Sequence, residues 1–479
     1  MAGAAIDYAD VQGTILRGYR VDMARHFVLS ITNAAKAGAF IAGLVDGTGG
    51  LPRITTAARW SQKPECFVNI AFTAAGLTAL GLPSQQLATF DPSFQLGASN
   101  AATAQKVGDV DNSAPANWIG GLSNGAAVHF ILSLWVDDDA AVLEKVTATV
   151  RAAFAGCIAE LSAHDANALP DNHVHFGYHD NIAQPTVLGA PPRKHNIPDD
   201  QPAVATGEFL LGYPNAGGGT SSVQPPQLST NSSYAAFRIL EQDVVGFEAF
   251  LQQFSQQAKI SVEKLAANVC GRWRNGNPLE LQPDDPGTFL PDAQVNNFTY
   301  VASTLPADDT LGVKCPIGSH IRRTNPRNEA IIGTDSTHHR ITRRAMPYGP
   351  LYDPATPDPA PVPRGLIGYF INASIFNQFE FLQSQWIQLA TFVKSATQPG
   401  DQTGANGNAV YNIRGEDVFL GVNDPSNSSF TIAAIGAKGS NNTNVSGFSR
   451  MIATRGGAYV FFPSITGLRY LATLPGTTT

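Results

Sequence analysis

The order of strand-like and helix-like segments repeats once along the chain, and this repetition most limits the possible fold. Short hydrophobic runs typical of strands are each followed by a helical pattern. In the first half these pairs cover residues 25–31 and 33–45, 66–72 and 73–80, and 128–136 and 140–156. In the second half they cover residues 233–240 and 242–257, 366–373 and 375–390, and 459–463 and 464–472.

Two successive sets of strands and helices indicate two α+β units of similar design. A further strand is weakly indicated near residues 173–178, and Asn33 is a plausible N-cap of the first helix. Stretches rich in Gly, Pro or Ser lie between the segments, and residues 350–363 contain too many prolines for a helix or a central strand. The predicted division is residues 1–220 for the N-terminal half and 221–479 for the C-terminal half.

Composition excludes several classes of protein. Hydrophobic residues make up 43% of the 479 residues, so disorder is not expected as the main state. The net charge of −7 disfavours sequence-independent binding of nucleic acid. There is no run of about 18 apolar residues, so no membrane-spanning helix is expected. The first residues lack the features of a secretory signal, which predicts a cytoplasmic protein, or a secreted one if a leader is missing from this sequence.

The four cysteines are scattered and form no CxxC pair: Cys66, Cys157, Cys270 and Cys315. A disulfide scaffold and a four-thiolate zinc site are therefore not expected. We expect buried free thiols instead.

Three regions concentrate side chains that can do chemistry, at residues 173–185, 315–327 and 338–350. Residues 314–350 hold one Lys and six Arg against two acidic residues, although the whole chain is acidic. Such a cluster suggests an anionic partner, which could be a phosphate, a carboxylate or a haem propionate. A surface cluster of arginines without a ligand is the alternative.

Two metal-binding interpretations compete with simpler ones. His173, His175 and His179 could in principle bind zinc, but their spacing matches no closed zinc pattern. Cys315, which precedes a proline, is compatible with a haem-thiolate ligand, but a buried thiol is the simpler interpretation. Motifs for a P-loop, a GxSxG elbow or a GxGxxG turn before a helix are absent from the sequence.

The motifs together resemble the dye-decolorizing peroxidase family of haem peroxidases, over nearly the whole chain. The fragments that carry the resemblance are DVQG at residues 10–13, HFGYHD at 175–180, GEFLLGYPN at 207–215, GRW at 271–273, CPIGSHIRRTNPR at 315–327, RRAMPYG at 343–349 and RGGAYVFFPS at 455–464. Their order and spacing make the combination specific, and the length is similar to that of the larger members.

The resemblance implies an α+β fold of two ferredoxin-like halves, each an antiparallel sheet with packed helices, in a dimeric α+β barrel-like arrangement. It implies haem b, iron protoporphyrin IX, in the C-terminal half. His320 looks like the proximal ligand of the iron, Asp180 like the distal aspartate and Arg343 like the distal arginine. Arg327 looks like a partner of a haem propionate, and Arg322 is a weaker candidate.

One position departs from the family's GxxDG motif, because Asn181 stands where the last glycine is expected. Asparagine tolerates a left-handed backbone better than most residues, so we expect the turn to be kept. The acceptor for the second nitrogen of His320 is left open; Glu380 is conceivable.

These residue types suit peroxide chemistry. A carboxylate with a reference pKa of about 3.9 stays ionised in mildly acidic solution, where it can accept a proton from hydrogen peroxide and return it to the leaving oxygen. An arginine can stabilise the negative charge that develops as the O–O bond breaks. An acidic pH optimum is therefore expected.

The expected partners are hydrogen peroxide and an organic reductant such as a dye or a phenol, which gives electrons one at a time. Trp386, Tyr369 and Tyr348 are candidates for carrying electrons to the haem, and ordinary core packing is the alternative for each. No carboxylate cluster indicates a manganese site. Two other functions stay open: a haem-binding protein with weak or no peroxidase activity, for storage or sensing, and a binding scaffold without haem.

Overall fold

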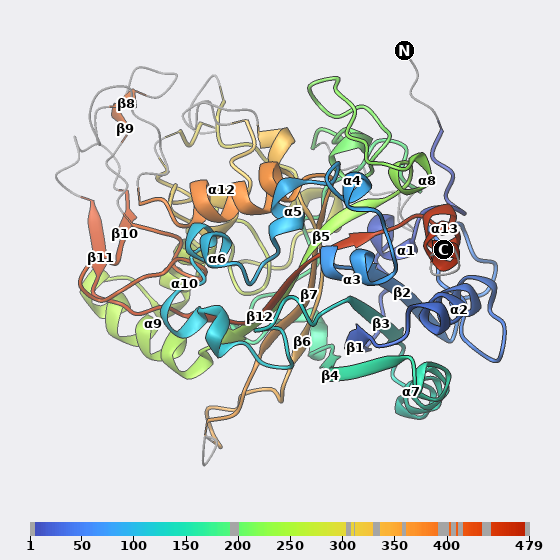
Figure 1. Ribbon diagram of the computed structural model, residues 1–479. Coiled ribbons are helices and arrows are strands. Elements are labelled where there is room, and N and C mark those ends of the chain that lie inside the picture. Colours follow the sequence, from blue (N-terminus) through green and yellow to red (C-terminus); the bar gives the residue numbers. More distant parts are fainter. Residues whose placement is uncertain are drawn as a thin grey trace.

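A single antiparallel sheet of eight strands runs through the molecule (Figure 1). The computed structural model describes residues 5–191, 201–302, 308–310, 312–328, 336–356, 361–390, 402–403, 409–410, 415–433 and 442–474. Four strands of the sheet come from the first half: β1 (Met23–Ile31), β2 (Cys66–Phe72), β3 (Phe130–Val136) and β4 (Ile158–Asn167). Four come from the second half: β5 (Ser233–Gln242), β6 (Thr342–Tyr348), β7 (Gly365–Asn372) and β12 (Ile452–Phe462).

The two halves contain the same strand topology. The sheet order is β4-β1-β3-β2-β12-β5-β7-β6. When the four strands of each half are numbered along the chain, both halves show the order fourth, first, third, second. This is the ferredoxin-like order, and the two copies join where β12 pairs with β2. The two end strands, β4 and β6, also lie close to each other, which curves the sheet towards a barrel. The predicted α+β fold is confirmed; the division at residue 220 falls between the two copies and stays a prediction.

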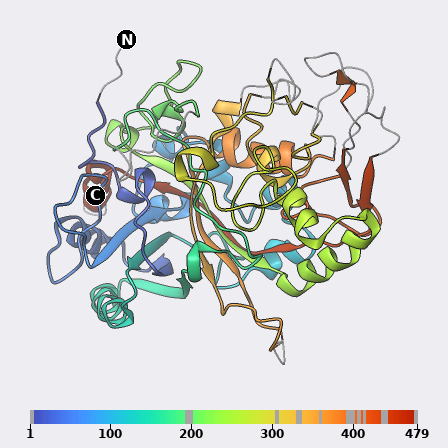
Figure 2. The same cartoon turned by 180° about the vertical axis from the view of Figure 1, so that it is seen from behind.

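Helices cover the outer faces of the sheet. The longer ones are α2 (Ala34–Asp46), α7 (Ala140–Phe154), α9 (Val244–Ala258), α10 (Val262–Cys270) and α13 (Ile465–Thr473). Figures 1 and 2 show α2 and α7 at one end of the molecule and α9 and α10 at the other, while the C-terminal helix α13 packs beside α2. Each of these helices begins after a side chain that accepts a backbone N–H of the first turn; Asn33, for example, accepts from Lys36 as predicted.

Short elements make up most of the connections. The short helices are α1 (Gly13–Leu16), α3 (Ala74–Ala79), α4 (Ser84–Leu87), α5 (Pro92–Leu96), α6 (Ala101–Val107), α8 (Pro226–Ser229), α11 (Asp292–Val295) and α12 (His320–Thr324). The 3₁₀ turns are η1 (Asp111–Ser113), η2 (Pro115–Asn117), η3 (Pro170–Asn172), η4 (Thr206–Glu208) and η6 (Ser336–His339), and two π-helical segments are η7 (Ile375–Glu380) and η8 (Leu382–Ile387). Two small ribbons are formed by β8 (Gln402–Thr403) with β9 (Ala409–Val410), and by β10 (Ser429–Ile432) with β11 (Thr443–Ser446).

Two strands differ from the sequence-based expectation. The prediction of a strand near residues 173–178 is wrong, because this segment is a turn. The fourth strand of the first half is β4, which lies just before it in the chain. β4 lies at the end of the sheet order and is partly exposed, so its hydrophobic pattern is weak. β6 was not expected either, because its sequence contains two arginines and a proline. No helix within the described ranges combines the length and the apolar character that crossing a membrane would require.

A buried polar chain links strands of the two halves that are not neighbours in the sheet. The Nδ1 atom of His26 lies 2.7 Å from Ser133 Oγ, which lies 2.7 Å from the hydroxyl of Tyr369. His26 and Ser133 belong to β1 and β3 of the first half, and Tyr369 belongs to β7 of the second. Burial lowers the pKa of His26 to about 3, so its ring is neutral in the folded protein at ordinary pH.

The low pKa of His26 predicts a specific loss of stability in acid. As the pH falls from about 6.5 towards 3, the unfolded chain takes up a proton at this residue and the folded protein does not, so unfolding becomes more favourable by up to about 1.4 kcal/mol per pH unit. In His26→Gln, which cannot titrate, the free energy of unfolding should therefore fall less steeply with decreasing pH. Denaturant unfolding at several pH values between 3.5 and 7 measures this difference, and equal slopes in the two proteins would contradict the buried neutral state.

Candidate active site

A cavity lies against β6 and β7, beside α12. Its empty space is about 810 Å³, counted together with the part of the mouth that opens to solvent. The wall contains four arginines, Arg272, Arg327, Arg340 and Arg343. Its apolar side chains are Ala183, Pro185, Ile321, Ile341, Phe370, Phe379, Leu382, Ile387 and Leu420, and its other polar ones are Tyr300, His320, Thr324, Asn325 and Gln383.

His320 begins α12 and is held in a fixed orientation. Its Nδ1 atom lies 2.9 Å from Oδ2 of Asp417, whose side chain is fully buried. The other oxygen of Asp417 accepts the backbone N–H groups of Phe419 and Leu420, at 3.0 and 2.8 Å. Nε2 of His320 makes no hydrogen bond to any described residue and is left available to a ligand in the cavity.

The charge of Asp417 is stabilised although the residue is buried. Burial alone would raise the pKa of this carboxyl group. The charge and hydrogen bond of His320, the N–H of Leu420 and the nearby Arg323 together outweigh burial and hold the pKa of Asp417 below its ordinary value. Asp417 is therefore an anionic acceptor, which fixes the proton of His320 on Nδ1 and leaves Nε2 as the basic atom.

Sequence analysis did not find Asp417. The residue lies 97 positions after His320 in a polar segment without a regular pattern, so nothing in the sequence connects the two. The suggestion that Glu380 accepts the hydrogen bond of His320 is wrong, because the Glu380 carboxylate binds Ser93 and Lys106 instead.

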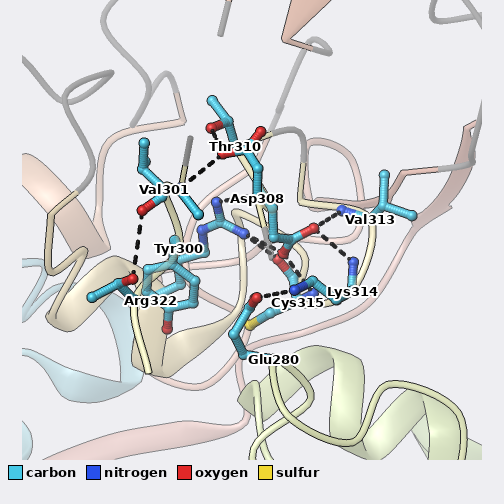
Figure 3. A network of polar contacts seen from close by, with 12 residues as sticks. Glu280, Tyr300, Val301, Asp308, Thr310, Val313, Lys314, Cys315 and Arg322 are labelled. Carbon is cyan, nitrogen blue, oxygen red and sulfur yellow. Dashed lines mark hydrogen bonds and ion pairs between the residues drawn. The ribbon is translucent and has the colours of Figure 1, made fainter. Parts of the chain in front are cut away.

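A buried polar network holds the segment that leads into α12 (Figure 3). The guanidinium of Arg322 is fully buried, lies 4.2 Å from the ring centroid of Tyr300 and donates to Asp309 Oδ2 at 2.9 Å. Asp309 in turn accepts the backbone N–H groups of residues 313, 314 and 315. Arg322 is thus part of the support of α12 and does not line the cavity, so its weaker assignment to a haem propionate is wrong.

Arg343 is fixed on the cavity wall by the segment that follows the 175–181 turn. Its Nη2 atom donates to the carbonyl of Ala183 at 2.8 Å, and its backbone N–H donates to Gln184 Oε1 at 3.1 Å. Arg327 also lines the cavity; its guanidinium lies 3.7 Å from the ring centroid of Phe298 and donates to Asn296 Oδ1 at 2.7 Å.

Asp180 lies apart from these three residues. Its side chain is exposed, and it is not among the residues that line the cavity. It belongs to the turn that leads to Ala183 in the cavity wall, and its backbone N–H donates to Asn172 O at 2.8 Å. The next residue, Asn181, has a φ of +62°, so the left-handed turn expected at this position is confirmed. The structure brings His320, Arg327 and Arg343 together and leaves Asp180 at the surface.

The competing metal-binding interpretations find no support in the described residues. His175 donates Nε2 to the carbonyl of Tyr348, and no group of three metal-ligating side chains occurs in these parts of the chain. The four cysteines are free, as expected. Cys315 is buried, and burial raises the pKa of its thiol to about 12, so it does not present a thiolate to the cavity.

Comparison with known proteins agrees with this fold. Residues 10–170 match the family model described as the DyP dimeric alpha+beta barrel domain. Peroxidase 2 of Mycetinis scorodonius is 30% identical over 490 residues, covering 98% of this chain and 88% of the relative, and the dye-decolorizing peroxidase msp1 of the same fungus is 29% identical over the same shares. The solved DyP-type peroxidase from Auricularia auricula-judae superimposes with a TM-score of 0.78 at 26% identity, covering 98% of this chain and all of that one.

The fold and the relatives define a peroxidase, an oxidoreductase that uses peroxide as electron acceptor. The chain belongs to the dye-decolorizing peroxidase family, whose members are haem enzymes.

The residues of the cavity fit such a cofactor. Nε2 of His320 is an imidazole nitrogen of the kind that binds haem iron, and the phenylalanines and aliphatic side chains of the wall suit a porphyrin ring. Arginines on the same wall suit its carboxylates.

Asp417 determines which ring nitrogen of His320 carries the proton. Replacing its carboxylate by the amide in Asp417→Asn should therefore strongly weaken haem binding. In Asp417→Asn the amide can still accept the N–H groups of Phe419 and Leu420, but its NH₂ group faces Nδ1 of His320. The ring proton then moves to Nε2, which can no longer bind a metal, so haem affinity should fall about 10- to 100-fold. Titration of the haem-free protein with haem, followed by absorbance, measures this affinity.

Asp424→Asn is the matched control, because Asp424 is an exposed carboxylate of the same segment that binds only its own turn. Equal haem affinity in Asp417→Asn and Asp424→Asn would contradict the role of Asp417.

Proposed function

We propose that this peroxidase holds haem b in the cavity, where Nε2 of His320 would bind the iron. The observation that carries the proposal is the pair His320–Asp417, which presents an unpartnered basic nitrogen to a cavity whose wall also holds Arg343. Arg327 and Arg340, on the same wall, are the proposed partners of the propionates. When bound, haem supplies the redox chemistry that splits peroxide and accepts electrons one at a time.

We assign the proton transfer to Asp180 and the stabilisation of charge to Arg343. Asp180 takes a proton from hydrogen peroxide and returns it to the oxygen that leaves as water. Arg343 keeps its positive charge at every relevant pH, so it stabilises the negative charge that develops on the departing oxygen and does not carry the proton. Its hydrogen bond to Ala183 holds the guanidinium in place before the reaction begins.

The proposed reductants are dyes, phenols and other bulky donors of single electrons. One solved relative of the family, 27% identical with a TM-score of 0.77, was determined in complex with 2,6-dimethoxyphenol, which supports a phenolic reductant for this chain. Trp386 and Tyr369 are both buried, so neither can meet such a reductant directly at the surface.

The second candidate function is a haem-binding protein with weak peroxidase activity. The exposed position of Asp180, outside the residues of the cavity wall, favours it. The two functions differ in whether Asp180 acts on peroxide.

Removing either proposed catalytic group should slow the reaction with peroxide. Asp180→Asn removes the proton acceptor, and we expect the rate to fall about 10²- to 10⁴-fold. Arg343→Leu removes the charge, and we expect a fall of about 10²- to 10³-fold. Stopped-flow mixing of the haem-loaded protein with hydrogen peroxide, followed by haem absorbance, measures the rate without a reductant.

Two variants serve as controls for this experiment. Asp171→Asn removes an exposed carboxylate nearby in the chain and should leave the rate unchanged. Arg343→Lys keeps the positive charge and should recover part of the activity lost in Arg343→Leu. If Asp180→Asn reacts with peroxide as fast as the unaltered protein, the assignment of the proton acceptor is wrong.

A further inference from the structure

The helix that carries His320 takes its position from contacts with other parts of the chain. α12 has five residues, which is too short for a helix to be stable in water by itself. Two consecutive residues of this helix, Arg322 and Arg323, are fully buried arginines. Arg322 anchors the helix to Asp309 (Figure 3), whereas Arg323 donates to backbone carbonyls of two other segments.

The first of these segments is the end of η8, which forms part of the cavity wall. The Nη1 atom of Arg323 donates to the carbonyl of Trp386 at 2.5 Å and to that of Ile387 at 3.2 Å. The last carbonyls of a helical segment lack partners within it and carry a partial negative charge, so a guanidinium suits them. Because the side chain of Ile387 lines the cavity, Arg323 joins α12 to this wall.

The second segment leads to Asp417. Nη2 of Arg323 donates at 2.5 Å to the carbonyl of Gly415, two residues before Asp417. The backbone N–H of Asp417 donates at 2.9 Å to the carbonyl of Ile387, which also accepts from Arg323. One guanidinium therefore connects the helix of His320, the end of η8 and the start of the segment that carries Asp417.

We propose that Arg323 is a positioning residue, which holds the carboxylate of Asp417 against Nδ1 of His320 before any cofactor binds. Arg323 is not among the residues that line the cavity, so it acts through these two residues. The consequence for the cofactor rests on the proposed function, because an imidazole fixed in one orientation presents Nε2 to the iron.

A guanidinium has the geometry that this task requires. Its terminal nitrogens hold their N–H donors in one rigid plane, as a fork. In Arg323 the two nitrogens donate to different segments, so the group between them fixes the distance from Gly415 to the end of η8. A lysine has one nitrogen at the end of a flexible chain, so it would keep the charge without fixing this distance.

The turn after Asp417 is held by a contact that does not reach α12. Asn423 Nδ2 donates to the carbonyls of Asp417 and Val418, at 2.7 and 3.3 Å. Between described residues, two hydrogen bonds join this segment to α12: the one from His320 and the one from Arg323. Without the donors of Arg323 the second bond is lost, and Asp417 can move relative to the imidazole ring.

The proton on Nδ1 of His320 tests the proposal. In the full chain without haem, labelled with nitrogen-15 at histidine, NMR measures how fast this proton exchanges with water. We expect exchange about 10-fold faster in Arg323→Lys, because the hydrogen bond to Asp417 opens more often. Exchange should be faster still in Arg323→Met, which removes every donor; if that variant does not fold, Arg323→Lys decides alone.

Retention of haem is the second measurement, and it uses the loaded protein. A ring that is less well oriented binds the iron less firmly, so haem should pass to an excess of apomyoglobin about 10-fold faster in Arg323→Lys than in the unaltered protein. Haem absorbance follows the transfer.

Arg25→Lys is the matched control. Arg25 is a buried arginine on β1 in the first half, where it binds Asp165 and Glu144. This change should lower the free energy of unfolding but leave proton exchange and haem retention unaltered. Proton exchange that is unchanged in Arg323→Lys, or that is accelerated equally in Arg25→Lys, overturns the inference, because Arg323 then supports only the fold.

The two measurements separate the inference from the proposed function. Exchange of the Nδ1 proton is measured without haem, so an unchanged rate in the Arg323 variants overturns the inference alone. If His320→Gln retains haem as firmly as the unaltered protein does, the proposed binding of the iron by His320 fails. Faster exchange in Arg323→Lys would then still establish that Arg323 positions Asp417.

Discussion

Alternation of side chains along β6 and β7 is the constraint on which the rest of the site depends. Arg343 and Phe370 are directly paired and face the cavity, whereas the next pair, Arg344 and Tyr369, faces the other side of the sheet. On that side Arg344 donates to backbone carbonyls of the first half and Tyr369 joins the chain to His26. A shift of one residue in this pairing would exchange the two sets, so the register of two strands determines both the cavity wall and the contact between the halves.

The arginine-rich segment illustrates how much of the site the sequence could predict. Its composition predicts that some arginines face an anionic ligand, and Arg327, Arg340 and Arg343 line the cavity. It could not indicate that Arg322 and Arg323 are fully buried and bind Asp309 and backbone carbonyls. The arginines that line the cavity differ from the buried ones in their tertiary contacts. The contacts of Arg322 and Arg323 with residues 13 to 92 positions away cannot be read from the local sequence.

The fold was predictable where strands are hydrophobic, and less so at the ends of the sheet. The central strands β2, β3 and β5 are buried on both faces and appear in the sequence as continuous apolar runs. β4 and β6 lie at the ends and alternate with polar residues, so the same criterion missed them. For the site, the family resemblance pointed to His320 and Arg343, which line the cavity, and to Asp180, which does not. Asp417 carries no local signal in the sequence and could be found only from the three-dimensional structure.

The 175–181 turn and Arg343 form one physical unit, which bears on how Asp180 can act. The positive φ of Asn181 turns the chain towards Ala183, and the carbonyl of Ala183 holds the Arg343 guanidinium. A side chain other than Asn or Gly at position 181 is strained in this conformation, so the turn would shift and weaken the hydrogen bond to Arg343. The carboxylate at the surface and the guanidinium in the cavity wall are therefore coupled through three residues of backbone. Changes at either end are expected to be non-additive, since each alters the position of the other.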